Sequence, residues 1–300
     1  MKRLKLKELL ITLISILVIS SSLIACNKNN GYSSSEKEKP SLESSNEKNN
    51  STNKEEDKIK DSKSEKDKNR FEGIETTSED MNIPVLCYHD VTPNNPNNNE
   101  LLVNPNKFKE QLQYLKDNNY TPITLDELYS YLRENKPLPK KPVVITLDDG
   151  YKGNYEYAYP LLKEFNFPAT IFVISNYVGA KDYMTNEELK EMSDNGIEIE
   201  SHTFKHDDLS TLDENKQFET FKSSKEALEK ITGKPVDYVA YPFGRYNEET
   251  RVAAKKAGYK LGFNLNGNFA DRKDNDFNID RVYVSNNDSL EKFESRLKEN

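Results

Sequence analysis

The stretch ITLDDGYKGNY, residues 145–155, places two adjacent carboxylates, Asp148 and Asp149, directly after an apolar run that begins at Val143. This run is rich in β-branched residues, which predicts a buried strand. Asp-Gly after a strand is ordinary turn chemistry, so the pair alone predicts no more than a turn. Because adjacent aspartates repel each other and a turn needs only one, the second carboxylate calls for a partner elsewhere in the chain.

Apolar runs of the same kind recur between Met81 and Asn300. Helical patterns lie between most of them, and capping boxes at Thr124–Glu127 and Thr185–Glu188 open two of the helices. Alternating strands and helices predict parallel βα units, and seven strands favour a closed or nearly closed α/β barrel of the TIM type over an open sheet. The expected strands span residues 83–88, 143–147, 169–174, 197–200, 238–241, 259–263 and 279–284.

The three histidines of the chain all follow predicted strands. His89 follows the first strand and His202 and His206 follow the fourth, while Asp148 and Asp149 follow the second. Such barrels build their sites on the loops that leave the C-terminal ends of the strands, so we expect these five side chains on one face. His202 and His206 are four residues apart and could share one face of a helical turn, although such a pair alone is more often solvated. With one carboxylate they would form a two-His-one-carboxylate metal shell, which leaves the other aspartate free as a base.

These motifs resemble those of the polysaccharide deacetylases of carbohydrate esterase family 4. Thr146-Leu-Asp-Asp-Gly150 is similar to the family's Thr-Phe-Asp-Asp-Gly, and His202-Thr-Phe-Lys-His206 is similar to its His-Ser/Thr-x-x-His. The resemblance covers most of residues 81–300 and implies a single catalytic domain with a deformed (β/α) barrel. It implies Asp148 as the general base, and Asp149, His202 and His206 as ligands of one divalent metal ion, zinc by preference, with Co, Ni or Fe as alternatives. The reaction implied is de-N-acetylation of an N-acetylglucosamine polysaccharide with release of acetate.

Two departures from the family pattern matter for the subtype. The third motif, Arg-x-Pro-x-Gly, is matched only partly by Ala240–Gly244, because Ala240 replaces the arginine that orients the catalytic aspartate in the family. Arg245 or Arg281 would have to take over that role. The family's final Leu-x-His, whose imidazole protonates the leaving amine, is also missing, since no histidine follows His206.

His89 is the candidate for the missing acid. In a closed barrel the first and last strands are neighbours, so the acid would have moved from the end of the chain to its start. The branch of the family that deacetylates poly-β-1,6-N-acetylglucosamine has this kind of permuted arrangement, and Tyr88-His-Asp-Val91 resembles it. Alternatively, His89 is a buried ring that hydrogen-bonds a strand end. We further expect Tyr151, Phe243 and Tyr241 to bind the substrate, since aromatic faces suit sugar rings.

Three other functions stay open at this stage. A peptidoglycan N-acetylglucosamine deacetylase would have its substrate at hand in the cell wall. An inactive sugar-binding lipoprotein of the same fold is suggested by Ala240, although a pure binder has no need of a free base such as Asp148. An unrelated barrel metallohydrolase is the third.

The N-terminus has the pattern of an export signal: basic residues, a mostly apolar run over residues 9–24, and Leu23-Ile-Ala-Cys26. The run is too short for a membrane span, and the last four residues resemble the bacterial lipobox, which implies lipidation of Cys26. An ordinary secretory signal is the alternative. We therefore expect a signal peptide at 1–25, a disordered polar tether at 26–80 and the deacetylase domain at 81–300. The protein would be lipid-anchored on the extracellular face of the bacterial membrane, reaching into the cell wall.

The net charge is −8, and because residues 1–70 are net basic, the acidic excess falls on the predicted domain. Such a domain is a poor partner for nucleic acid and suits a neutral or cationic ligand. Cys87 is then unpaired within the first apolar run and is expected to pack in the core of a monomer.

Overall fold

The computed structural model describes residues 70–298. The expected signal peptide, Cys26 and most of the tether lie outside the described residues. Residues 70–80, which we assigned to the tether, contribute strand β1 (Thr76–Thr77), which pairs with β6 (Leu138–Pro139). Arg70 also forms an ion pair with Glu127 at 2.5 Å. The described structure thus starts before the boundary drawn at Met81. Within it, no helix is long and apolar enough to cross a membrane.

The central sheet confirms the predicted barrel. Its seven main strands are parallel and run in the order β11-β10-β9-β8-β7-β2-β12. A single parallel bridge, Phe263 to Ile279, spans the seam between β11 and β12, so the barrel is deformed and nearly closed. The strands are β2 (Val85–Tyr88), β7 (Pro142–Leu147), β8 (Thr170–Val173), β9 (Glu198–Ser201), β10 (Tyr238–Ala240), β11 (Leu261–Phe263) and β12 (Val282–Tyr283).

The strand β5 (Thr121–Ile123) was not predicted. It pairs in parallel with the first half of β7, outside the barrel order. Its three residues include Pro122, and so short a run has no recognisable period. By contrast, all six residues of β7 are buried, as expected for a parallel strand covered on both faces.

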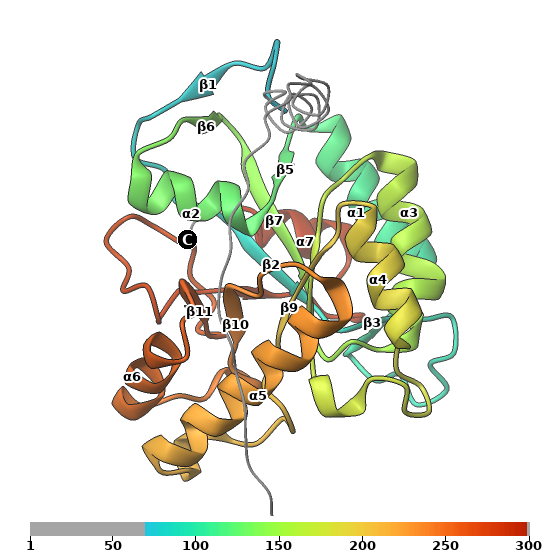
Figure 1. Cartoon of the computed structure of the whole chain (residues 1–300). Helices are drawn as coiled ribbons and strands as arrows, with labels where there is room; N and C mark the ends of the chain where they lie inside the picture. Colours follow the sequence, from blue (N-terminus) through green and yellow to red (C-terminus); the bar gives the residue numbers. More distant parts are fainter. Residues whose placement is uncertain (1–69, 299–300) are drawn as a thin grey trace, which may run out of the picture. The chain divides into compact units, whose positions relative to one another are not determined.

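Helices cover the outside of the strands. Figure 1 shows α1, α3 and α4 grouped on one side and α5 and α6 on another. Both predicted capping boxes are present, with the side chains of Thr124 and Thr185 accepting hydrogen bonds from the amides three residues later. The helices are α1 (Pro105–Asp117), α2 (Leu125–Glu134), α3 (Tyr159–Phe165), α4 (Asn186–Asp194), α5 (Glu214–Thr232), α6 (Glu248–Lys256) and α7 (Leu290–Ser295).

The loops after the strands contain short ordered segments. A two-stranded parallel sheet of β3 (Asp90–Val91) and β4 (Leu102–Val103) follows β2, and a π-helical turn at Asn154–Ala158 follows β7. Helical turns of the 3₁₀ type follow β8 at Ser175–Tyr177 and β10 at Pro242–Gly244. These structured loops fix the side chains at the C-terminal ends of the strands, where the expected site lies.

Candidate active site

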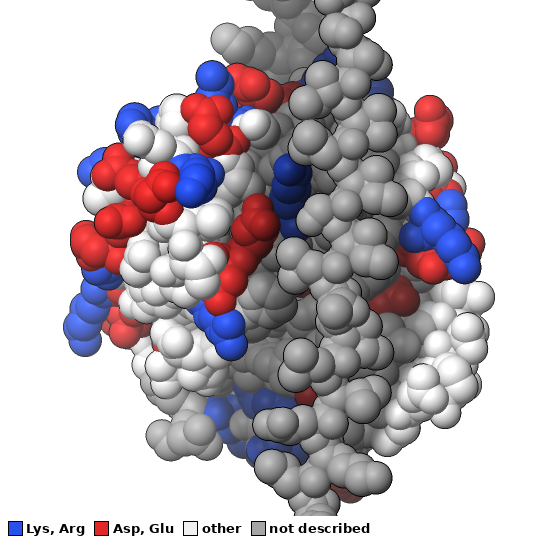
Figure 2. Space-filling view, turned by 90° about the horizontal axis from the view of Figure 1, so that it is seen from below, with Lys and Arg blue, Asp and Glu red and all other residues white. Residues whose placement is uncertain are grey.

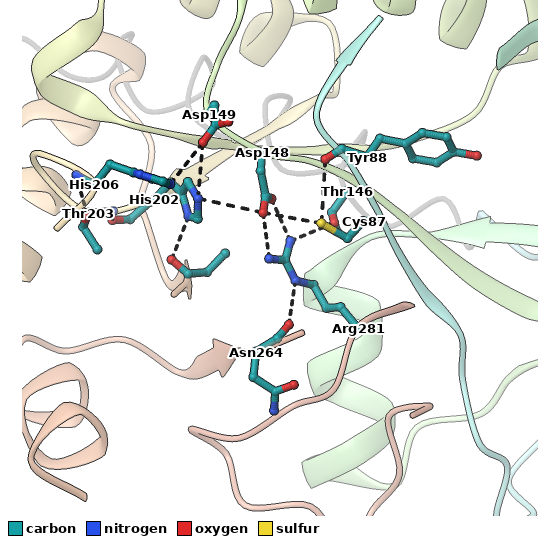
Figure 3. A network of polar contacts seen from close by, with 12 residues as sticks. Cys87, Tyr88, Thr146, Asp148, Asp149, His202, Thr203, His206, Asn264 and Arg281 are labelled. Carbon is teal, nitrogen blue, oxygen red and sulfur yellow. Dashed lines mark hydrogen bonds and ion pairs between the residues drawn. The ribbon is translucent and has the colours of Figure 1, made fainter. Parts of the chain in front are cut away.

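Asp149, His202 and His206 converge at the C-terminal ends of β7 and β9 (Figure 3). Each histidine places Nε2 at 3.4 Å from Asp149 Oδ1. His202 Nδ1 lies 2.8 Å from the carbonyl oxygen of Ala240. Since a carbonyl can only accept, Nδ1 is the protonated nitrogen, and the lone pair of Nε2 faces Asp149.

The loop that presents the two histidines is not the helical turn expected from their spacing. Thr203 and His206 both adopt left-handed conformations, with φ of 66° and 61°. The Thr203 hydroxyl accepts a hydrogen bond from the His206 amide at 3.1 Å, which closes the loop. Asp149 and Phe243 are left-handed too, with φ of 72° and 60°. Such conformations are costly for non-glycine residues, especially β-branched ones, and cluster at functional sites.

The donor set of these three residues fits a divalent cation. Asp149 Oδ1 is buried and has no hydrogen-bond partner within the described residues. Burial and the neighbouring Asp148 raise the pKa of Asp149 to about 7, while burial lowers the pKa of His202 to about 3 and also lowers that of His206. Two neutral imidazoles and an unpartnered carboxylate oxygen are the ligands that a metal of the zinc type takes. The three groups lie close enough together to hold one ion.

Asp148 occupies a different electrostatic setting. Arg281 donates from Nη1 to Oδ1 at 2.7 Å and from Nη2 to Oδ2 at 2.8 Å, and both side chains are buried (Figure 3). Burial alone would raise the pKa of Asp148, but the guanidinium charge outweighs it and holds this pKa well below its usual range. Asp148 is therefore ionised and already paired with a cation. For the same reason a second group of possible ligands, Cys87, His89 and Asp148, is a poorer metal site than the first.

Arg281 stands immediately before β12 and also donates from Nε to the carbonyl of Asn264 at 3.1 Å. It contacts Asp148 as expected of one of the two candidate arginines. Arg245 does not: its guanidinium pairs with Asp208 at 2.6 Å on the surface. The expectation for Arg245 is therefore wrong, because the loop after β10 directs its side chain outward.

Cys87 in β2 and His89 directly after it complete the surroundings of Asp148. Cys87 is buried as expected, but its Sγ also lies 3.4 Å from Asp148 Oδ2, so it does more than pack in the core. His89 follows the same strand, and its ring contacts Tyr283 on β12 edge-on at 5.8 Å. Its Nδ1 is buried without a partner in the part of the chain that the structure describes. Burial lowers the pKa of His89, against the opposing effect of Asp148.

The three expected sugar-binding aromatics fall in different places. Phe243 is 56% exposed and its ring lies 4.6 Å from that of His206. Tyr151 is half-buried and interacts electrostatically with Asp149. Tyr241 is fully buried, and its hydroxyl donates to the carbonyl of Phe277 at 3.1 Å. The substrate-binding role expected for Tyr241 is therefore wrong, because its ring belongs to the core.

Sequence reasoning missed the contact between Cys87 and Asp148. Alternate residues of a strand point to the same face, so the spacing of Cys87 and His89 held a signal for it. Tyr183, which stacks on Tyr151 with ring centroids 5.1 Å apart, was missed as well. It lies in a loop far along the chain, and no periodicity marks it.

Comparisons with known proteins agree with this geometry. Residues 135–262 match the model of the polysaccharide deacetylase family. YxkH of Bacillus subtilis (strain 168), a candidate polysaccharide deacetylase by its name, is 37% identical over 209 residues, which cover 70% of this chain and 74% of YxkH. The poly-beta-1,6-N-acetyl-D-glucosamine N-deacetylase of Staphylococcus aureus (strain MSSA476) is 34% identical over 200 residues, covering 61% of this chain and 68% of that protein.

A solved structure, the Streptococcus pyogenes deacetylase PplD in complex with acetate, superposes with a TM-score of 0.70 at 33% identity, covering 73% of this chain and 100% of that one. Fold, residues and relatives thus agree. The chain belongs to the polysaccharide deacetylases of carbohydrate esterase family 4, hydrolases that act on non-peptide carbon–nitrogen bonds and remove N-acetyl groups from polysaccharides.

Proposed function

We propose that the substrate is an N-acetylglucosamine polymer, specifically poly-β-1,6-N-acetylglucosamine. The observation that carries this proposal is the position of His89 at the end of β2, where a ring nitrogen, Cys87 Sγ and an Asp148 oxygen lie within 4.8 Å of one another. A histidine from the first strand end of the domain would thus take the place of the family's C-terminal one. The resemblance to the S. aureus enzyme supports the same substrate.

Asp149, His202 and His206 would hold one divalent ion, with zinc proposed for its preference for imidazole and carboxylate ligands. When bound, such an ion supplies Lewis acidity toward the acetyl carbonyl and lowers the pKa of water. The positive charge of the ion would also lower the pKa of the Asp149 carboxyl, which burial and Asp148 otherwise raise. The ligand carboxylate would then be ionised throughout the working pH range.

Asp148 is proposed as the general base. Arg281 keeps it ionised and fixes the direction of both oxygens, so its lone pairs are ready to take the proton of the attacking water. Because its pKa is low, Asp148 would pass that proton on readily. The contact from Cys87 to Oδ2 adds a second constraint on the carboxylate plane.

His89 is proposed as the general acid that protonates the departing sugar nitrogen. Its lowered pKa makes the imidazolium a stronger acid than an exposed histidine, which suits proton donation to an amine. Acetate and a free amino sugar would be the products. Neither His89 nor Asp148 is one of the three proposed metal ligands.

Arg281 also argues against an inactive sugar-binding protein. That alternative was raised by Ala240, which removes the family's usual arginine. The guanidinium of Arg281, which lies directly before β12, pairs with both oxygens of Asp148. We infer that Arg281 compensates for the missing arginine at position 240.

The surface is compatible with an uncharged polymer. Figure 2 shows basic and acidic side chains interspersed on the described surface visible from below.

We propose in addition that a lipid on Cys26 anchors a monomer outside the cell and that the polar segment up to about residue 70 gives it reach into the wall. Fractionation of cells carrying Cys26→Ser tests the anchor, since the variant should leave the membrane fraction.

The substrate is tested by acetate release from β-1,6-linked and β-1,4-linked N-acetylglucosamine oligomers, assayed side by side with the full chain in mild detergent. We expect the β-1,6 series to have the higher kcat/KM. A clear preference for the β-1,4 series would overturn the proposed substrate and favour peptidoglycan. An enzyme without activity on either series would refute the proposal for N-acetylglucosamine polymers altogether.

A further inference from the structure

Three tyrosine rings form a cluster around Tyr183 beside the proposed metal ligands. Tyr151 stacks on Tyr183 with centroids 5.1 Å apart and an interplanar angle of 27°, and Tyr177 meets Tyr183 edge-on, also at 5.1 Å. All three side chains are half-buried, so each keeps part of its surface accessible. Within residues 70–298, Tyr155 and Tyr157 pack against the hydrophobic core, whereas these three rings pack on each other outside it. We call them the tyrosine platform.

The loop that holds Tyr177 and Tyr183, residues 175–184 between β8 and α4, is tied to both metal-ligand loops. On the histidine side, the amides of Ser175 and Asn176 donate to the carbonyls of Thr203 and Phe204. On the aspartate side, the amide of Met184 donates to the carbonyl of Gly150 at 3.1 Å, and Tyr151 and Tyr183 form a β-bridge. The platform is therefore fixed in position relative to the proposed metal ligands.

Side-chain polarity links the platform to the site as well. The Tyr151 hydroxyl interacts with both Asp149 and Tyr183. From a different loop, the exposed ring of Phe243 lies against His206. Aromatic surface therefore flanks the three ligands from two separate loops. A core role does not explain the tyrosines, because their rings lie outside both hydrophobic clusters of the described residues.

We propose that Tyr177 and Tyr183 form a binding subsite for the neutral hexosamine ring next to the one that is deacetylated. This inference rests on the proposed function, since it requires a glycan chain as the substrate. The axial C–H groups of a pyranose ring pack on aromatic faces, and phenol hydroxyls can exchange hydrogen bonds with sugar hydroxyls. Rigid aromatic side chains also lose little conformational entropy on binding, so a preformed platform costs little to use.

The consequence is a dependence of activity on chain length. An oligomer that reaches the platform gains binding energy that a shorter substrate cannot use, and an aromatic contact of this kind is worth about tenfold in affinity. We therefore expect kcat/KM of the wild type to rise from the dimer to the pentamer. An aryl acetate, which has no sugar, should be independent of the platform's stacking surface.

The test compares Tyr183→Ala, Tyr183→Phe and Tyr155→Ala on dimers to pentamers of the preferred linkage and on an aryl acetate. We expect Tyr183→Ala to lower kcat/KM on the pentamer by roughly 5- to 20-fold and to flatten the length dependence, while the rate on the aryl ester stays unchanged. Tyr183→Phe keeps the ring and should retain most of the length dependence. Tyr155→Ala removes a ring that packs on the core elsewhere and should leave the length dependence as it is.

An equal loss of activity on all oligomers and on the aryl ester, or no loss at all, would overturn the platform proposal while leaving the proposed function intact. If Tyr183→Ala fails to fold, Tyr183→Leu, which keeps apolar volume but has no flat face, is judged by the same criterion. Failure of the proposed function has a different signature, because the wild type itself would then release no acetate from any oligomer.

Discussion

Replacing Arg281 by methionine tests the electrostatics at the centre of the site. In the wild type, two hydrogen bonds of 2.7 and 2.8 Å join its guanidinium to Asp148, and the two side chains are 0% and 1% exposed. Arg281→Met leaves the carboxylate buried without its cation. Breaking a buried ion pair from one side costs about 3–5 kcal/mol of unfolding free energy, and we expect a loss of that size near neutral pH.

In Arg281→Met, the contribution of Asp148 to the pH dependence of stability should also have the opposite sign from that in the wild type. In the wild type the Arg281 charge depresses the pKa of Asp148. Ionised Asp148 therefore contributes stability above the pKa that its carboxyl has in the unfolded chain, and this contribution is lost as the pH falls through the lower pKa of the folded state. In Arg281→Met, burial becomes the dominant influence and raises the pKa of Asp148 above its unfolded value. The variant should therefore lose stability as the pH rises, and Arg281→Met/Asp148→Asn should recover part of the loss.

Denaturant unfolding of the protein, freed of metal with a chelator, between pH 4 and pH 8 measures both effects. Arg245→Met is the matched control, because its guanidinium forms an exposed ion pair with Asp208 and such pairs are worth about 0–1 kcal/mol. If Arg281→Met and Arg245→Met unfolded with equal free energies and parallel pH profiles, our account of how Asp148 is held ionised would be refuted.

Five further substitutions test the proposed roles in the site and the electrostatics of the core. His206→Ala should abolish both metal retention, measured by elemental analysis, and turnover. Asp148→Asn should keep metal affinity within a few fold but lower kcat by roughly 10²- to 10⁴-fold, whereas Asp149→Asn should weaken metal binding itself. His89→Ala should retain metal and slow amide hydrolysis by roughly 10²-fold, with a smaller effect on an aryl acetate, whose leaving group needs no proton. Burial raises the pKa of Glu200, so the wild type loses stability as the pH rises through the pKa that this carboxyl has in the unfolded chain. Glu200→Gln should therefore be more stable than the wild type at pH 8, and this difference should shrink toward pH 5.

Each of these expectations has a contradicting result. Full metal content in purified His206→Ala would remove that residue from the ligand set. Identical metal content and rates for Asp148→Asn and Asp149→Asn would end the division of labour between the aspartates. Loss of metal in His89→Ala, or equal losses on amide and ester, would return His89 to a structural role. A wild-type and a Glu200→Gln protein with the same pH profile of stability would show that Glu200 does not titrate as described.

The sequence by itself determined the barrel and most of the constellation at its C-terminal face. Parallel strands buried on both faces need continuous apolar runs, and the run ending at Leu147 is such a strand in full. Strand ends meet at one face in this fold, so the chain positions of Asp148, Asp149, His202 and His206 sufficed to bring them together. The capping boxes are equally local, since side chain and backbone three residues apart decide them.

Only the tertiary structure decided which arginine meets Asp148. Arg245 and Arg281 are equivalent in sequence terms, and the pairing of β12 with β2 places Arg281 next to Asp148 although 133 positions separate them. The same holds for Tyr241 in the core and Tyr183 in the platform, whose surroundings come from distant segments. The left-handed backbone at Thr203 and His206 could not be predicted from the spacing of the two histidines either. Both residue types disfavour this conformation, and the surrounding loop imposes it. Periodicity records which face a residue belongs to, whereas register and loop geometry determine what that face touches.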